Sequence, residues 1–160
     1  MKSKTKTYVW CIVLTLAIGA LSAIITMGNM DVYNDIIKPP LAPSGFVFPI
    51  VWTILYTLMG ISLALVINKG RNKGVYTLPA IRTYVLQLAV NFFWSIIFFN
   101  MRAYFLSFVW LILLWFLIVD MIFRFYKISK LASYINIPYF LWVTFAGYLN
   151  FMIYILNRNS

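Results

Sequence analysis

The chain has 160 residues, of which 64% are hydrophobic and only 10% are charged, and its mean hydropathy is +0.91. A soluble domain has about 45–50% apolar and about 25% charged residues, so this composition indicates that lipid rather than water surrounds the chain. The net charge is +10, and the basic residues lie between apolar runs, which favours a role in membrane topology over nucleic-acid binding. The chain has no His and a single cysteine, Cys11, which argues against zinc sites, internal disulfides and His-based catalytic triads.

Five apolar segments approach the length of about 20 residues that a helix needs to cross a bilayer. They are about 8–27, 46–67, 80–99, 104–125 and 131–156. The sequence therefore predicts an all-α integral membrane protein, a bundle of five transmembrane helices in a single domain that spans 1–160. A cleaved signal peptide is an alternative for the first segment, but its apolar stretch is too long for a typical one.

The loop 28–45 between the first two segments is too long to be a minimal connector. It contains Pro39, Pro40 and Pro43, which fix the backbone and remove amide donors. Long ordered loops often cover or form binding sites. We therefore expect this loop to be a stiff lid over a pocket.

The basic residues indicate the orientation of the helices. Five spans put the termini on opposite sides, and ten Lys and Arg then lie on the N-terminal side against three on the other. The positive-inside rule predicts that the N-terminus is cytoplasmic and that the C-terminus and the loop 28–45 lie outside a plasma membrane.

Three of the predicted helices carry a stripe of aromatic, amide and small residues at helical spacing. The stripes are Trp52 and Tyr56; Gln87, Asn91 and Ser95 with Trp94 beside them; and Tyr139, Trp142, Ala146 and Asn150. Amides at membrane depth need a polar partner. Two interpretations remain open from spacing alone: helix packing through small residues and amides, or a pocket in which Trp and Tyr stack on a flat apolar ligand.

Other patterns carry weaker signals. Asp120 lies four residues before Arg124, which favours a structural ion pair over a proton relay. Gly19 and Ala23 form a small-residue pair that suits contact within the monomer or between two copies. The C-terminal Leu149–Tyr154–Arg158 spacing fits a loose sterol-binding pattern that apolar helices often match by chance.

Three blocks of this sequence resemble the TspO/MBR family of tryptophan-rich sensory proteins, also called translocator proteins or peripheral benzodiazepine receptors. They are KPPLAPSGFVFPIVWTILYTLMGISLAL from Lys38, QLAVNFFWSIIFF from Gln87 and PYFLWVTFAGYLNFMIYILN from Pro138. The blocks occur in the family's order and the resemblance covers nearly the whole chain. The richness in Ile, Asn and Lys is associated with a bacterial member.

The resemblance implies a five-helix bundle, often a homodimer, that binds protoporphyrin IX, other tetrapyrroles and related flat apolar ligands, and in some members a sterol or lipid. It implies no required cofactor and no metal. By motif position, the residues implied in ligand binding are Trp52, Tyr56, Asn91, Trp94, Trp142 and Ala146 in the walls and Tyr33 and Pro43 in the lid. Leu41 and Ser44 replace the family's usual Trp and Pro in the loop.

The resemblance favours a membrane receptor or sensor over two alternatives. One alternative is an enzyme that degrades porphyrin in light, which the resemblance implies for some members through pocket tryptophans, here Trp52 and Trp142. The other is a transporter of tetrapyrrole or lipid, for which the short loops and the lack of an internal repeat give little support.

Overall fold

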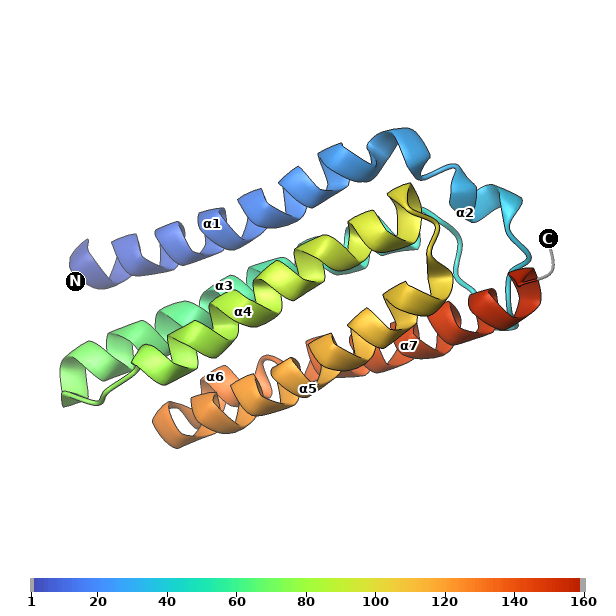
Figure 1. Ribbon diagram of the computed structural model, residues 1–160. Coiled ribbons are helices and arrows are strands. Elements are labelled where there is room, and N and C mark those ends of the chain that lie inside the picture. The colour runs from blue at the N-terminus through green and yellow to red at the C-terminus, as the bar shows by residue number, and fades with distance from the viewer. Residues whose placement is uncertain (1, 159–160) are drawn as a thin grey trace.

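The computed structural model describes residues 2–158, and these residues form helices without any strand. The long helices are α1 (Lys2–Thr26), α3 (Val47–Lys73), α4 (Leu78–Ser95), α5 (Tyr104–Ile128) and α7 (Ile137–Asn157). The short ones are η1 (Met27–Asn29), α2 (Val32–Asp35), the π-helical turn η2 (Ile96–Asn100) and α6 (Lys130–Tyr134). Figure 1 shows the long helices running side by side as one elongated bundle.

Five helical segments of the described chain are long and apolar enough to cross a membrane, which confirms the predicted all-α membrane fold. They are Lys4–Asn29, Val47–Lys73, Leu78–Asn100, Tyr104–Ile128 and Lys130–Asn157. Helices suit a bilayer because each satisfies its own backbone hydrogen bonds where no water is available.

Two boundaries differ from the sequence-based expectation. The second span continues past Ile67 to Lys73, because its polar residues still form helix, and it ends at Gly74, which caps it in the left-handed conformation (φ 62°). The fifth span is not continuous: α6 and α7 are separated at residues 135–136, just before Pro138. Proline lacks an amide donor, so it is tolerated in the first turn of a helix and not in its interior.

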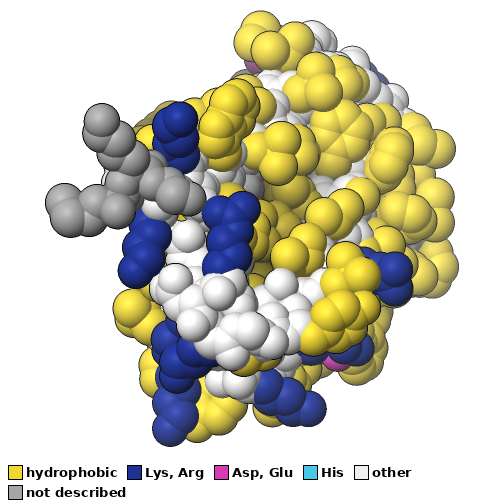
Figure 2. Space-filling model, turned by 90° about the vertical axis from the view of Figure 1, so that its left-hand side faces the viewer, with side chains coloured by type: hydrophobic (Ala, Val, Ile, Leu, Met, Phe, Trp, Pro, Cys, Tyr) yellow, Lys and Arg dark blue, Asp and Glu magenta, His cyan; other side chains and the backbone are white. Residues whose placement is uncertain are grey.

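The two ends of the bundle differ in charge. The N-terminus, the turn between α3 and α4 and the turn between α5 and α6 lie at one end, and α2 and the C-terminus lie at the other (Figure 1). Figure 2 looks onto the first end and shows Lys and Arg side chains gathered there. The predicted separation of basic residues is therefore present in the fold.

The inward faces of α1 and α5 differ in side-chain size. The buried positions of α5 are occupied mainly by large apolar side chains: Leu111, Leu114, Ile118, Met121 and Phe125. Those of α1 are occupied by Cys11, Thr15, Ser22 and Thr26. Where α1 crosses α3 the backbones are in close approach, since a Cβ added at Gly60 would lie 2.6 Å from the Cα of Ile12.

Candidate functional site

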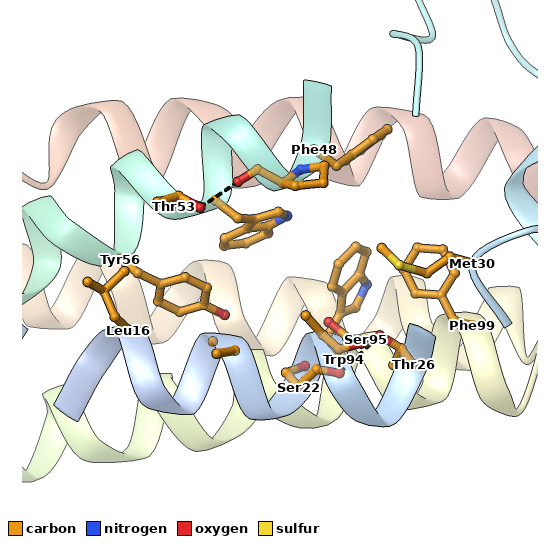
Figure 3. A pocket seen from close by; sticks show the side chains of 15 residues that line it. Leu16, Ser22, Thr26, Met30, Phe48, Thr53, Tyr56, Trp94, Ser95 and Phe99 are labelled. Carbon is orange, nitrogen blue, oxygen red and sulfur yellow. Dashed lines mark hydrogen bonds between the residues drawn. The ribbon is translucent and has the colours of Figure 1, made fainter. Parts of the chain in front are cut away.

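A cavity of about 290 Å³ lies between α1, α3 and α4 in the half of the bundle nearer α2. It is lined by residues of α1, of α3, of the end of α4 with η2, and by one residue after η1: Leu16, Gly19, Ala20, Ser22, Ala23 and Thr26; Phe48, Pro49, Trp52, Thr53 and Tyr56; Trp94, Ser95 and Phe99; and Met30. Figure 3 shows Tyr56 and Trp94 projecting into this space from different helices. Its volume is at the lower limit of the roughly 300–1,000 Å³ typical of ligand pockets.

The small residues of α1 create room for the aromatic wall. A Cβ added at Gly19 would lie 2.5 Å from Cε2 of Tyr56, so only glycine accommodates this ring position. Ala20, Ser22 and Ala23 continue the same side of the helix along the cavity. The hollow therefore follows from a run of small residues opposite Tyr56.

Trp52 and Trp94 present aromatic surface to the cavity. The ring centroid of Trp52 lies 5.5 Å from that of Tyr56 and 6.3 Å from that of Trp94. The Nε1 of Trp94 donates to Oδ1 of Asn150 (3.1 Å), which also accepts from Ser107 (3.0 Å). This buried bond fixes the indole edge, so the orientation of the Trp94 ring is set before any ligand arrives.

Phe48 separates the cavity from two residues of the predicted site. Its ring makes edge-to-face contacts with Tyr33 (5.2 Å) and with Trp142 (5.9 Å). The Nε1 of Trp142 is buried and has no hydrogen-bond partner among the described residues. An unpaired buried donor costs about 1–3 kcal/mol, so this indole N–H is a candidate to meet a polar group of a ligand or a water molecule.

Asn91 lies in a polar cluster at the centre of the bundle. Its Nδ2 donates to the hydroxyl of Tyr139 (3.1 Å), and that hydroxyl donates to Oε1 of Gln87 (2.8 Å). All three side chains are at most 1% exposed. The Oδ1 of Asn91 and the Nε2 of Gln87 have no partner within the described chain, so the cluster retains hydrogen-bonding capacity.

The loop 28–45 is tied to the bundle at several points. The Asn157 side chain accepts from the amide of Ile37 (2.9 Å) and donates to its carbonyl (3.0 Å), and Tyr148 donates to the carbonyl of Pro40 (3.1 Å). Tyr33 donates to the carbonyl of Pro43 (2.9 Å). Burial raises the pKa of the Tyr33 phenol, which keeps it protonated as this donor.

The structure divides the eight predicted site residues into three groups. Trp52, Tyr56 and Trp94 line the cavity. Tyr33 and Ala146 line a smaller adjoining void of about 20 Å³, which also touches Phe48 and Trp94. Asn91, Trp142 and Pro43 line neither; they lie in the central cluster, behind Phe48 and in the loop respectively.

The departures from the family pattern in the loop lie away from the cavity. Leu41 is 79% exposed and adopts a left-handed backbone conformation (φ 70°). The carbonyl of Ser44 accepts from the amide of Val47 at the start of α3 (2.9 Å). Neither residue lines the cavity, so the walls do not depend on them.

The contribution of α1 to the cavity was missed from the sequence. Gly19 and Ala23 were interpreted as a packing pair, yet both line the hollow. The available signal was the succession of small residues at 15, 19, 22 and 26, which repeats at helical spacing and places them on one face.

The Asp120–Arg124 ion pair predicted from spacing is confirmed. The Nε of Arg124 lies 2.6 Å from Oδ2 of Asp120, which also accepts from Thr83 (3.0 Å). Both charged side chains are partly exposed and lie toward the C-terminal end of α5. This arrangement supports a structural pair that joins α5 to α4.

The fold and cavity define a multi-pass membrane protein of five long helices, three of which enclose an aromatic hollow. The sequence model of the TspO/MBR family matches residues 11–156. The chain belongs to the TspO/MBR family.

Named relatives cover most of the chain. It is 37% identical to the tryptophan-rich protein TspO of Chlorobaculum tepidum, across 98% of this chain and 99% of that protein. It is 30% identical to the tryptophan-rich sensory protein of Cereibacter sphaeroides, across 94% of each. It is 27% identical to the translocator protein of Bos taurus, across 88% of this chain and 83% of that protein.

Proposed function

We propose that this protein is a membrane receptor or sensor that binds a tetrapyrrole, such as protoporphyrin IX, or a related flat apolar ligand in the cavity between α1, α3 and α4. The observation that carries the proposal is the aromatic wall of Trp52, Tyr56 and Trp94 around a hollow of about 290 Å³. The names of the relatives, a tryptophan-rich sensory protein and a translocator protein, agree with a sensor role.

The chemistry of the cavity suits a planar ligand. Aromatic rings stack on a flat conjugated system with a preference for offset or edge-to-face geometry, and Trp52 and Trp94 supply such surfaces from two helices. A ligand in a low-dielectric site also gains from a few fixed polar groups. Ser22, Thr26, Thr53 and Ser95 place hydroxyl groups along the cavity.

A ligand larger than the cavity requires movement of Phe48. Phe48 is the ring that stands between the hollow and the unpaired Nε1 of Trp142. Rotation of this ring would join the cavity to Trp142 and to the small void beside Ala146. A carboxylate of the ligand would then have a buried donor to pair with, which removes the cost of leaving that donor unpaired.

The test is titration of the purified protein with protoporphyrin IX in the dark, followed by quenching of tryptophan fluorescence. The expected result is saturable quenching, with an apparent affinity at least about tenfold weaker in Trp52→Ala, since a buried aromatic anchor often contributes 2 kcal/mol or more to binding. Trp115→Ala is the matched control, because Trp115 bonds Thr144 outside the cavity. Equal affinity in wild type and Trp52→Ala would overturn the assigned cavity.

Illumination distinguishes binding from the photochemical alternative. Of the two tryptophans implicated in that alternative, Trp52 lines the cavity and Trp142 lies behind Phe48. The binding proposal predicts that the ligand absorbance bleaches at the same rate with and without the protein. A protein-dependent product that is lost in Trp52→Phe would favour the enzyme instead.

We also propose that the basic end of the bundle is cytoplasmic and that α2 and the C-terminus lie outside, in a plasma membrane. The positive-inside rule supports this orientation, since Lys69, Arg71, Lys127 and Lys130 flank the spans at one end and Lys38 lies at the other. A reporter active only in the cytoplasm should work when fused at the N-terminus and fail when fused after residue 160. The reverse pattern would overturn the orientation.

A further inference from the structure

A second, separate apolar groove runs along the membrane-facing side of α1 and α4. Its volume is about 600 Å³, and α3 contributes its floor. Trp10, Leu14 and Leu21 line it from α1, and Val85 and Ala89 line it from α4. None of its lining residues lines the aromatic cavity, so α1 borders two different hollows.

The groove is open to the surroundings of the bundle. Trp10 is 70% exposed, and Leu14, Leu21 and Val85 are each more than half exposed. Within a bilayer this surface contacts lipid tails directly. An acyl chain is therefore the occupant available to the groove at all times.

Each helix that lines the groove carries a cation near the basic end of the apolar lining. Lys6 precedes Trp10 by four residues, Arg82 precedes Val85 by three, and Arg71 follows the lining residue Ile67 by four. Residues at these spacings lie on the same helical face, about 5 Å apart along the axis. Three cations from three helices therefore border one end of the groove.

The position of Arg71 is also fixed by a contact. Its guanidinium donates to Oγ1 of Thr7 (3.4 Å), which lies one turn before the groove residue Cys11 on α1. Arg71 therefore reaches from α3 across to α1 at the mouth of the groove.

Acidic competition for these cations is weak. The chain has three acidic side chains, of which Asp31 and Asp35 lie at the opposite end. Asp120 is held by Arg124 and Thr83. The positive charge at the groove mouth is thus available to an anion from outside the protein.

We propose that this groove binds an anionic phospholipid, with its phosphate on Lys6, Arg71 and Arg82 and one acyl chain along α1 and α4. The charge at the mouth selects the headgroup and the apolar lining holds the chain. Basic pockets between transmembrane helices are suited to anionic headgroups, and each nearby Lys or Arg contributes about 1 kcal/mol, or about fivefold in affinity.

The test uses the full-length protein in phosphatidylcholine vesicles with increasing fractions of phosphatidylglycerol brominated on its acyl chains. Bromine quenches tryptophan fluorescence on contact. The quenching that is present in the wild type and lost in Trp10→Phe comes from Trp10 and measures lipid in the groove. Brominated phosphatidylglycerol should quench this signal at a mole fraction at least about tenfold lower than brominated phosphatidylcholine. Salt at about 1 M should reduce the difference, because it screens charges beyond about 3 Å.

A pair of charge-matched variants decides whether the site is specific. Lys6→Gln/Arg71→Gln/Arg82→Gln should abolish the preference, whereas Lys69→Gln/Lys127→Gln/Lys130→Gln removes the same charge at the same end and should keep it. Equal loss in both variants would show a diffuse surface potential and overturn the site. Equal quenching of the wild type by both lipids would overturn the selectivity, and quenching by neither would mean that a second copy of the chain covers the groove.

Discussion

Helices α1 and α5 both face the inside of the bundle, but their inward side chains differ greatly in size. The α5 stripe includes Leu114, Ile118, Met121 and Phe125, each at most 1% exposed, and it fills its side of the core. The α1 stripe is Cys11, Thr15, Gly19, Ser22 and Thr26, and the aromatic cavity lies beside its second half. Both helices are about equally long, 25 residues each.

The comparison shows that the cavity is a consequence of side-chain size rather than of an unusual backbone. Small residues on one helix leave volume that aromatic residues on the opposing helices line but do not fill. Close packing normally removes such voids because unfilled space forfeits dispersion contacts. A bundle that keeps one small-residue stripe next to an aromatic wall therefore retains room for a ligand at some cost in stability.

The largest expected effect on stability comes from creating a cavity on the α5 side of the core, where the packing is complete. Phe125→Ala removes a fully buried ring that stacks on Tyr84 (centroids 6.2 Å apart), and should lower the free energy of unfolding by about 3–5 kcal/mol. Phe99→Ala removes the same atoms from the wall of the existing cavity and should cost less. The measurement is reversible unfolding in mixed micelles. Similar losses of unfolding free energy in both variants would contradict the difference between the filled side and the cavity side.

The second effect, on ligand binding, comes from filling the cavity beside α1. Ser22→Phe places a ring in the cavity and should weaken protoporphyrin IX binding by more than about tenfold, because the ligand and the new ring compete for the same volume. Ile24→Phe adds a ring to a lipid-facing position of the same helix and should leave binding unchanged. Fluorescence titration of both variants checks the prediction, and unchanged binding in Ser22→Phe would place the ligand elsewhere.

A smaller effect is expected at the bond that orients the cavity wall. Asn150→Ala leaves the Nε1 of Trp94 and the hydroxyl of Ser107 without their shared acceptor, which should cost about 1–3 kcal/mol. Ligand binding should weaken by a few fold because the indole is no longer held in place. Thermal unfolding and titration measure the two effects. Asn100→Ala, which removes exposed bonds at the end of η2, is the control.

The smallest effect is expected in the loop. Asn157→Ala removes both hydrogen bonds to Ile37 and should cost at most about 1 kcal/mol, because the bonds are exposed to solvent. Amide hydrogen exchange should accelerate in residues 36–43 and stay constant in α5. If exchange in the loop did not change, the tether through Asn157 would have no part in holding it.

The sequence predicted the helices better than the site. The five spans followed from apolar length, and their ends were wrong where the decisive residue was a local one, such as Gly74 or Pro138. Trp52 and Tyr56 were predicted on one face from their helical spacing, Trp94 was predicted beside the stripe of the next long helix, and the resemblance assigned all three to the pocket; all three line the cavity. Asn91 was predicted in the pocket wall, yet its amide bonds Tyr139 in the core, since the sequence does not reveal which neighbour an inward amide meets.

Sequence alone determined that the chain has five helices long and apolar enough to cross a membrane and that positive charge gathers at one end of the bundle. These properties are sums over many residues, and the bilayer enforces them through backbone hydrogen bonding and charge. Only the tertiary structure decided that α1 borders two hollows, one against Tyr56 and one beside Val85. The position of a cavity depends on differences of a single methyl group between opposing faces, as at Gly19, and those faces meet only when the helices pack.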